Sequence, residues 1–509
     1  MGINDLIGDK DRIKHLKMFG IHGLASLSDV NAISMRSMSY KDTRAYTSVE
    51  RALIENEDTE TALLVSTENK LDRDLTIVDN IRLRIENGGM LNIPEGATLK
   101  INGSLDADPY QVFGGGKDVD FGGSSRIPVV YPQWFGATGK GLIDDSRAIQ
   151  KAIDSLTSGG IVVFPPGQYL VLIPLELRNN VVLQGTEGGS VLTSTGTRGL
   201  VHGNGVTGAG LEHLKLTGGN DGVVFFNFSD RCFVNCCWLY NNANNGVLIN
   251  SSDNCKVTFC TIEDAGKNGV YLYNGTTNSR VEGCNILSPV NKGISIFNGS
   301  THNFAVANYL WNVGEAGIFI NDSTDTTHSN YNEIIANIVY RSGVSATSGG
   351  NGIEAGLEQL GANIMGNLIV QAGYGRAGLS LPSLYGVSIH GTDVSVIGNK
   401  AVSSLYHGFY FYEASDCTCI GNTSLNSSQD SVGSYDGIRV HGTVTNPSND
   451  NTFIGNRCRD KQGTKTQDYG IREAGTSDYN LFIANSLRGN ISGGITTVGV
   501  GTIADHNMS

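Results

Sequence analysis

The feature that most constrains this chain is a repeat of 23 or 24 residues in its middle part. Three successive copies are Cys232–Asn254, Cys255–Asn278 and Ser279–His302. Each copy holds three short runs of β-strand character: apolar-x-x-Cys, then an x-Ile or x-Leu pair, then Gly-apolar-x-apolar. A fixed period of this length, made of strand signals, is typical of stacked repeats that each contact only their neighbours. The sequence therefore predicts a β-solenoid.

The position held by cysteine in these copies becomes asparagine further along the chain. The series runs through Cys237, Cys260, Cys284, Asn308, Asn337, Asn367, Asn399, Asn422, Asn456 and Asn485. A side-chain amide repeated at one bend can donate to and accept from its copies in adjacent coils, so we interpret these residues as scaffold. The order of bend, short strand, turn and third strand predicts an all-β, right-handed parallel β-helix with three sheets. All nine cysteines are expected to be free and buried.

Composition and charge exclude several classes of partner. The chain is rich in glycine (67 residues) and poor in charged residues (17%), as short strands and tight turns require. The net charge of −13 argues against nucleic acid, because such binding depends on basic patches. No apolar run is long enough to span a bilayer, and the first residues do not resemble a signal peptide. We expect no membrane partner, no cofactor and no metal site, although acidic loops leave calcium open.

The stretch Tyr131–Val171 predicts a helix that covers one end of the solenoid. Its apolar residues fall on one helical face, with Asp144 as the expected N-cap and Gly159–Gly160 as the stop. An amphipathic helix in this place suits a lid over the open end of a β-solenoid, where unpaired strand edges need protection. The apolar face comprises Ala148, Ile149, Ala152, Ile153 and Leu156.

This stretch resembles the opening motif of the pectate-lyase superfamily, in the group related to glycosyl hydrolase 28. The motif is carried by Trp134–Ala137, by Asp144-Asp145 with the helix that follows, and by Phe164–Tyr169, while Lys140 stands where the family has Asp. Phage tailspikes and capsule depolymerases commonly begin in this way. The resemblance implies a parallel β-helix, a homotrimer, a virion or extracellular location and a polysaccharide substrate. The family's polygalacturonase signatures do not occur in order, so no catalytic residue is carried over.

We expect four parts along the chain. Residues 1–60 form an attachment or neck segment with a short helix over Thr47–Ile54 and Ser48 as its cap. Residues 61–136 form an N-terminal β region with the first coils, and residues 137–180 hold the capping helix and the strand after it. Residues 181–509 form the β-helix with a carbohydrate-binding face.

Alternation along the third strand of each coil separates inward from outward side chains. In Gly269–Tyr273, Val270 and Leu272 point inward, whereas Tyr271 and Tyr273 point outward. Successive coils stack at about 4.8 Å, so the outward residues form a continuous strip. Its early half is aromatic and offers flat platforms for sugar rings, with protein contact such as a trimer interface as the alternative. The proposed platforms are Tyr271, Tyr273, Phe297 and Phe319.

The late half of the strip gathers ionisable residues. Coil lengths also increase here, since successive third-strand glycines from Gly317 to Gly470 lie 35, 34, 22, 29 and 33 residues apart. Long turns on a regular scaffold are common places for binding sites. The insertions are 322–330, 341–350, 371–384 and 429–435. The residues proposed for catalysis or substrate binding in this half are Glu354, His390, Tyr410, Tyr412, Glu413, Arg439, His441 and Arg472.

Two chemistries fit these residues. Hydrolysis needs two carboxylates, and Glu354 and Glu413 lie two coils apart, about 9–10 Å along the axis and near the separation of inverting enzymes. Elimination from a uronic acid needs a cation against the carboxylate and a base for the C5 proton. Its candidates are Arg439 or Arg472 as the cation and His390, His441, Tyr410 or Tyr412 as the base. The depolymerase resemblance narrowly favours hydrolysis, with elimination and a non-catalytic adhesive virion protein as alternatives.

Overall fold

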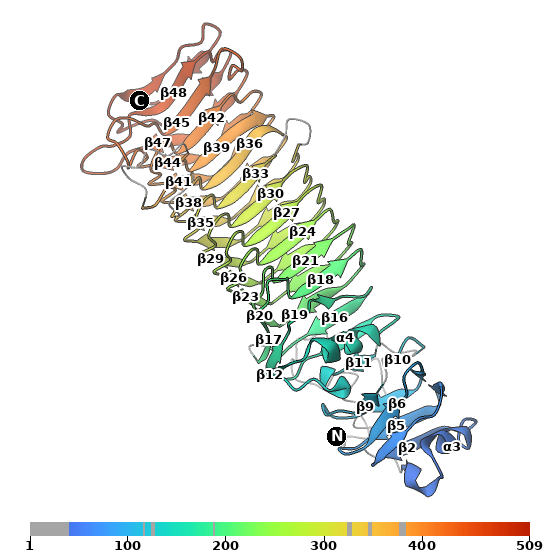
Figure 1. Ribbon diagram of the computed structural model, residues 1–509. Coiled ribbons are helices and arrows are strands. Elements are labelled where there is room, and N and C mark those ends of the chain that lie inside the picture. The colour runs from blue at the N-terminus through green and yellow to red at the C-terminus, as the bar shows by residue number, and fades with distance from the viewer. Residues whose placement is uncertain are drawn as a thin grey trace, which may run out of the picture. The chain divides into compact units, whose positions relative to one another are not determined.

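The computed structural model describes residues 40–115, 118–123, 128–186, 189–322, 328–344, 349–375 and 383–509, apart from the side chains of 357 and 358 (Figure 1). The described chain divides into two compact units. One contains residues up to Pro128 together with 132–136 and 154–158. The other contains 129–131, 137–153 and 159–509. Residues 1–39 of the predicted neck lie outside the described residues.

The N-terminal unit contains short parallel strands and one short helix, α3 (Val49–Ile54). Ser48 caps this helix, because its hydroxyl accepts a hydrogen bond from the N–H of Arg51. The predicted helix and its cap are therefore confirmed. The other elements are β1 (Lys41–Asp42), η2 (Thr43–Ala45), β2 (Thr61–Val65), β3 (Glu68–Lys70), β4 (Leu75–Ile77), β5 (Ile81–Ile85), β6 (Met90–Ile93), β7 (Thr98–Ile101), β8 (Ser104–Asp106), β9 (Phe113–Gly115), β10 (Asp118–Asp120) and η3 (Pro132–Phe135).

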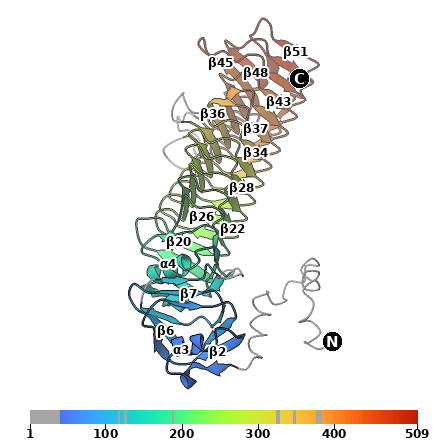
Figure 2. The same ribbon diagram turned by 90° about the vertical axis from the view of Figure 1, so that its right-hand side faces the viewer.

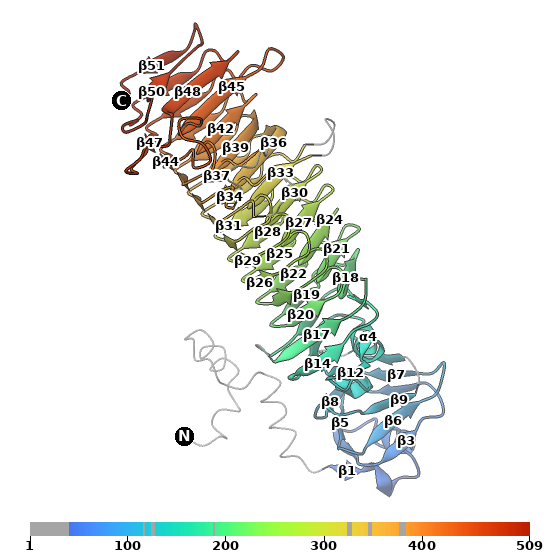
Figure 3. The same ribbon diagram turned by 60° about the vertical axis from the view of Figure 1, so that its left-hand side comes forward.

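The second unit is a three-sheet parallel β-helix, which confirms the predicted fold class. Each coil gives one strand to each of three long parallel sheets, called here the first, second and third sheets (Figures 2 and 3). The third sheet faces the viewer in Figure 1.

The strands of the first sheet are β11 (Val129–Val130), β13 (Gly160–Val163), β16 (Val181–Gln184), β19 (Gly210–Glu212), β22 (Phe233–Asn235), β25 (Lys256–Thr258), β28 (Arg280–Glu282), β31 (Phe304–Val306), β34 (Glu333–Ile335), β37 (Asn363–Met365), β40 (Ser395–Ile397), β43 (Thr418–Ile420), β46 (Thr452–Ile454), β49 (Leu481–Ile483) and β51 (Ile503–Asp505). Those of the second sheet are β12 (Lys140–Asp144), β14 (Gly167–Leu170), β17 (Ser190–Ser194), β20 (Lys215–Gly218), β23 (Trp238–Tyr240), β26 (Thr261–Glu263), β29 (Asn285–Leu287), β32 (Tyr309–Trp311), β35 (Ile338–Tyr340), β38 (Leu368–Val370), β41 (Lys400–Val402), β44 (Thr423–Leu425) and β47 (Arg457–Arg459). Those of the third sheet are β15 (Leu175–Glu176), β18 (Val201–Asn204), β21 (Val223–Phe226), β24 (Val247–Asn250), β27 (Val270–Tyr273), β30 (Ile294–Phe297), β33 (Ile318–Asn321), β36 (Ile353–Leu360), β39 (Val387–Thr392), β42 (Phe409–Tyr412), β45 (Ile438–Gly442), β48 (Tyr469–Gly475) and β50 (Gly493–Thr496).

The core lies inside the coils and is formed by the inward side chains of all three sheets. Val270 and Leu272 are fully buried, as the alternation predicts. Towards the C-terminus the core becomes aromatic: the ring of Phe453 lies 5.0 Å from that of Phe411 and 4.9 Å from that of Phe482. Side chains at equivalent positions of successive coils thus stack on one another and fill the interior.

The asparagine series forms a hydrogen-bonded ladder at the bend between the first and second sheets. The side-chain oxygen of Asn367 accepts from both the backbone N–H (2.8 Å) and the side-chain amide (3.0 Å) of Asn337. The amide of Asn367 donates in turn to the side-chain oxygen of Asn399 (2.9 Å) and to the carbonyl of Ile334 (2.8 Å). The same pattern links the ladder from Asn308 to Asn507. The predicted scaffold role is confirmed.

A second ladder, which the sequence analysis missed, lies at the bend between the third and first sheets. The N–H of Cys255 donates to Ser279, the N–H of Ser279 donates to Asn303, and the N–H of Asn303 donates to Asn332. All nine cysteines are free, but the prediction that all are buried is wrong for Cys236. Cys236 is exposed because it occupies the outer, left-handed position of its bend (φ 51°), directly before the ladder residue.

The predicted helix is α4 (Ser146–Asp154), at the N-terminal end of the β-helix (Figure 1). The expected N-cap at Asp144 is displaced by one residue, because the carbonyl of Asp145 accepts the first helical hydrogen bond, from Ile149. The carboxylate of Asp144 accepts from the N–H and hydroxyl of Ser146, and that of Asp145 accepts from the N–H groups of Thr138 and Gly139. Both carboxylates are engaged in local structure, as the sequence indicated.

Within the described residues, no helix has the length and apolar character that crossing a membrane requires.

Removing one step of the asparagine ladder should destabilise the β-helix. Asn367→Ala leaves the backbone N–H and the amide of Asn337 without their acceptor inside the core, so we expect a loss of about 3 kcal/mol in the free energy of unfolding. Urea denaturation followed by circular dichroism measures this loss. The control is Asn285→Ala, at an exposed outward position, where less than about 0.5 kcal/mol is expected. Equal losses in the two variants would contradict the scaffold role.

Candidate functional site

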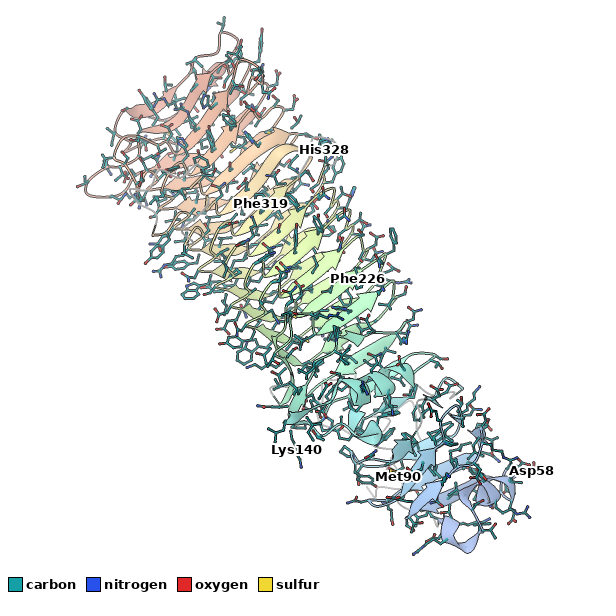
Figure 4. All side chains as sticks on the ribbon, in the orientation of Figure 1. Asp58, Met90, Lys140, Phe226, Phe319 and His328 are labelled. Atoms are coloured by element: carbon teal, nitrogen blue, oxygen red, sulfur yellow. The ribbon has the colours of Figure 1, made fainter. Side chains whose placement is uncertain are left out.

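The outward residues of the third sheet form the strip that the alternation predicts. In one column, the paired residues run from Val224 through Leu248, Tyr271, Ser295, Phe319, Glu354, Ser388, Tyr410 and Arg439 to Arg472. The second column contains paired Asn250, Tyr273, Phe297 and Asn321, and further on Tyr412, His441 and Ala474. We call these two columns the strip. Phe319, at the end of its aromatic half, and Phe226, on the earlier third-sheet strand β21, are labelled in Figure 4.

The aromatic half of the strip is a continuous stack of half-buried rings. The ring centroids of Tyr271 and Tyr273 lie 4.9 Å apart, those of Tyr273 and Phe297 6.3 Å, and those of Phe297 and Phe319 6.2 Å. Burial, and then the neighbouring Tyr273, raise the pKa of Tyr271 to about 12, so its phenol stays protonated. The stack presents ring faces and edges along the coils, as sugar platforms require.

Glu354 stands at the junction of the two halves, next to Phe319 in the preceding coil. Its side-chain oxygen accepts a 2.7 Å hydrogen bond from the amide of Asn351. Burial raises the pKa of Glu354, although Asn351 and Lys292 oppose the shift. Lys292 forms an ion pair with Glu315 (2.6 Å) and lies over the ring of Phe319 (4.8 Å). A carboxyl group with a raised pKa is suited to act as an acid.

Glu413 does not meet Glu354. It follows strand β42 and lies two coils from Glu354 and three residues further along the strand direction than the paired Tyr410, so the two backbones are about 14 Å apart. The Glu413 carboxylate accepts hydrogen bonds from Thr443 (2.7 Å) and Asn446 (3.3 Å), both in the following coil. Partial burial favours a higher pKa for Glu413, but these hydrogen bonds outweigh it and lower the pKa. The structure therefore holds the two carboxylates in separate surroundings.

Tyr410, Arg439 and His441 come together on adjacent strands β42 and β45. The phenol oxygen of Tyr410 lies 3.3 Å from Nδ1 of His441, and Tyr410 pairs directly with Arg439. Burial raises the pKa of Tyr410 and lowers that of His441, and the nearby Arg439 guanidinium lowers the pKa of His441 further. Near neutral pH this cluster therefore offers a protonated phenol, a neutral imidazole and a cation. We call these three residues the tyrosine–histidine–arginine cluster.

Arg439 is held in place by a buried carboxylate that the sequence analysis did not select. Asp436 is fully buried and forms an ion pair with Arg439 (3.2 Å). Burial raises the pKa of Asp436 to about 6, although Arg439 opposes the shift. The backbone N–H of Asp436 donates to Nδ1 of His407 (2.8 Å), and burial holds the pKa of His407 well below its usual value. His407 is therefore neutral, and it accepts a hydrogen bond from the residue that pairs with Arg439.

The other predicted residues surround this cluster. His390 stacks on Tyr412 with ring centroids 4.5 Å apart, and its Nε2 is buried with no partner among the described residues. Burial lowers the pKa of His390. Arg472 pairs with Arg439 along the column and forms an ion pair with Asp468 (2.9 Å).

A column that the sequence analysis missed lies at the corner just before each third-sheet strand. Tyr385, His407 and Asp436 each precede the glycine that opens the strand. The ring of Tyr385 lies 4.5 Å from that of Tyr410 and 5.6 Å from that of His407. Tyr385 belongs to the coil between that of Glu354 and that of Tyr410. Reading the residue before each third-strand glycine would have found this column.

Asp322, which directly follows β33, does not extend the site. Asp322 accepts from the N–H of Gly299, from Ser329 and from the amide of Gln359, so it holds neighbouring coils together. The side chain of Glu358 and parts of three of the insertions lie outside the described residues. Within the described part of the chain, no group of three His, Cys, Asp or Glu residues could hold a metal ion.

Comparison with known proteins finds one family model that matches part of the chain. Residues 133–363 match the sequence model of the family described as rhamnogalacturonase A/epimerase, pectate lyase-like. This segment is similar to pectate lyase-like β-helices. The predicted superfamily is therefore confirmed over this segment, which begins at the helix motif and ends in the coil after Glu354. No curated protein sequence matches the chain.

Solved structures resemble the β-helix of this chain at low sequence identity. The A-module of a mannuronan C-5 epimerase from Azotobacter vinelandii has 17% identity and a TM-score of 0.53, and the match covers 74% of this chain and 100% of that module. The tailspike protein 3 of bacteriophage CBA120 has 14% identity and a TM-score of 0.57, over 74% of this chain and 61% of that one. The pre-mature gene product 12 of bacteriophage phi29 has 14% identity and a TM-score of 0.56, over 74% and 57%. At these identities the likeness establishes the fold.

The electrostatic coupling inside the cluster can be measured directly. Because the guanidinium of Arg439 disfavours a second positive charge beside it, Arg439→Gln should raise the pKa of His441 towards its ordinary value of 6.5. A histidine ring titration by NMR measures this shift. Arg472→Gln is the matched control, and it should move the pKa of His441 less. An unchanged pKa in Arg439→Gln would place Arg439 too far from His441 for the roles proposed below.

Proposed function

We propose that this protein binds a bacterial surface or extracellular polysaccharide along the strip and cleaves it at the tyrosine–histidine–arginine cluster. The reaction we propose is β-elimination from a uronic acid unit. The observation that carries this proposal is the 3.3 Å contact between Tyr410 and His441, with Arg439 on the strand paired to Tyr410. The family match to pectate lyase-like proteins and the epimerase and tailspike neighbours support a polysaccharide as the substrate.

Each member of the cluster has a role that fits its protonation state. Arg439 lies against the uronate carboxylate and stabilises the negative charge that develops there when C5 loses its proton. The neutral imidazole of His441 accepts that proton. The electron pair of the C5–H bond forms the C4–C5 double bond, the bond from C4 to the glycosidic oxygen breaks, and protonated Tyr410 donates a proton to this leaving oxygen. The step needs no water and no further reactant.

The rest of the strip positions the chain of sugars. Tyr271, Tyr273, Phe297 and Phe319 offer stacking faces on one side of the cluster. Tyr412 lies on the same strand as Tyr410, and Arg472 continues the strip in the next coil. Sugar rings have an apolar face that packs on aromatic rings. The proposal includes a homotrimer located in a phage virion or outside the cell, supported by the tailspike neighbours.

Hydrolysis is the second candidate, and the raised pKa of Glu354 favours it. A general acid in a glycosidase has this property, and the sequence favoured this reaction. Elimination is preferred here because Glu354 and Glu413 point into different surroundings, about 14 Å apart at the backbone. Hydrolysis requires the carboxyl group of Glu354, whereas elimination at the cluster does not, so the variant Glu354→Gln distinguishes the two reactions.

The reaction class can be tested by product analysis on a panel of acidic capsule polysaccharides. Elimination should give oligosaccharides with an unsaturated terminal sugar, seen as new near-ultraviolet absorbance and as a mass lower by one water than the hydrolysis product. Tyr410→Phe and Arg439→Ala should each lower kcat/KM by about 100-fold or more, and thermal unfolding should stay nearly unchanged in Tyr410→Phe. Glu354→Gln should keep most of the activity.

Other outcomes identify the alternatives. New reducing ends without unsaturation, with loss of activity in Glu354→Gln, would mean hydrolysis. Binding without any product across the panel would mean a non-catalytic adhesive protein.

The acidic limb of the pH–rate profile should follow His441. A base must be unprotonated, and the pKa of His441 is lowered, so kcat/KM should rise with pH with a midpoint below pH 6.5. The raised pKa of Tyr410 keeps the acid protonated through neutral pH. A profile measured from acid to alkaline pH checks this. Activity that falls as pH rises through the acid range would instead indicate that the group that titrates is an acid, as expected for Glu354.

A further inference from the structure

The β-helix carries a second continuous surface on the bend that holds the asparagine ladder, away from the strip. On the first-sheet side of this bend, the last outward residue of six successive coils is aliphatic. These residues are Ile335, Met365, Ile397, Ile420, Ile454 and Ile483, and all are half-buried or exposed. Outward side chains on a solvated sheet face are usually polar, so an aliphatic column over six coils needs an explanation.

The apolar surface continues around the bend onto the second sheet. Its outward residues there include Trp311, Tyr340 and Val370 in one column and Tyr309 and Ile338 in the other. Ile338 is 40% exposed and Tyr309 38% exposed. We call the outward residues on the two sides of this bend, in the coils between Val306 and Leu487, the apolar edge.

The tip of the apolar edge is built from small residues. The left-handed position of each bend holds Ala307, Ala336, Gly366, Gly398, Gly421, Gly455 or Ala484. Small residues at a ridge allow another backbone to approach closely. The bend is also the most regular part of the coil, with two residues between the two strands each time. A smooth, straight edge of this kind suits packing against another straight edge.

The distribution of charge indicates that a second copy of this chain packs against the apolar edge. Each chain carries a net charge of −13, so two copies repel each other unless they meet where carboxylates are absent. Among the outward positions of the apolar edge named above, and those that pair with them along the second sheet up to Arg459, there is no Asp or Glu. The charged residues there are the cations Lys400, Arg457 and Arg459.

The size of the edge is sufficient for a specific contact. Seven coils at about 4.8 Å give about 34 Å of length, and about five residues of extended chain give about 15 Å of width. The edge thus offers roughly 500 Å² per copy, or about 1,000 Å² for a pair of copies, which is near the lower bound for a specific interface.

We propose that copies of this chain associate through the apolar edge, with like coils at the same height, leaving the strip free for polysaccharide. Symmetric assembly places the same residue of each copy near the symmetry axis, so the edge contacts itself. The inference names the surface of the proposed homotrimer and does not depend on the proposed reaction.

Light scattering on the full chain tests the association without using activity. The wild-type protein should have about three times the single-chain mass of 54.1 kDa, and Ile397→Glu with Ile338→Glu should shift it to the single-chain mass at micromolar concentration. Val444→Glu, at a residue that is 89% exposed, is the matched control and should leave the mass unchanged. A single-chain mass for the wild type, or an unchanged mass in the double variant, would overturn the proposal.

Cysteine cross-linking tests the location independently, in case the double variant fails to fold. In a Cys236→Ser background the remaining native cysteines are buried. Ala336→Cys, at the tip of the apolar edge, should then give dimers on mild oxidation. Asn274→Cys has the same left-handed backbone (φ 56° against 55°) and is exposed on another bend, and it should not. Cross-linking of Asn274→Cys but not of Ala336→Cys would mean that copies meet elsewhere.

Discussion

The interaction on which the rest of the structure depends is the stacking of buried amides at the bend between the first and second sheets. A β-helix must turn its backbone sharply inside every coil, and each turn brings polar groups into an apolar interior. The asparagine ladder satisfies these groups by letting each side-chain oxygen accept twice from the coil before it. Because each step requires its neighbour, the ladder fixes the register of the coils and therefore the alignment of the strip.

Because the coils are aligned, the outward residues of successive third-sheet strands lie side by side and form the candidate site. Glu354 on β36 and Tyr410 on β42 are far apart in the sequence. They share a surface because both pair with Ser388 of the intervening strand β39, ahead of the register shift in β36 between Ala355 and Gln359. The tyrosine–histidine–arginine cluster arises in this way, with Asp436 paired to Arg439 and His407 accepting from the N–H of Asp436. Chemistry on this fold is thus built from single residues of successive coils, each of which would be an ordinary surface residue alone.

Much of this could be predicted because a repeat shows its own periodicity. The inward and outward positions, the columns from Val224 to Arg472 and the scaffold role of the asparagines follow from a period of two within strands and a regular period between coils. The direction in which a long side chain leans could not be predicted. Glu354 and Glu413 look like a pair by coil count, but Thr443 and Asn446 draw Glu413 towards the following coil. The corner column with Tyr385, His407 and Asp436 was missed because alternation describes strands and says nothing of turns.

The constant bend and the variable corners have a consequence for how such a protein changes over time. From β19 to β47 the bend between the first and second sheets keeps a length of two residues, whereas the corners on either side of the third sheet range from short turns to long insertions. One residue added at the ladder would turn the side chains of the following second-sheet strand to the opposite face, but whole loops can be exchanged beside the strip without that penalty. The recognition of a new polymer can therefore be acquired coil by coil, with the scaffold inherited unchanged.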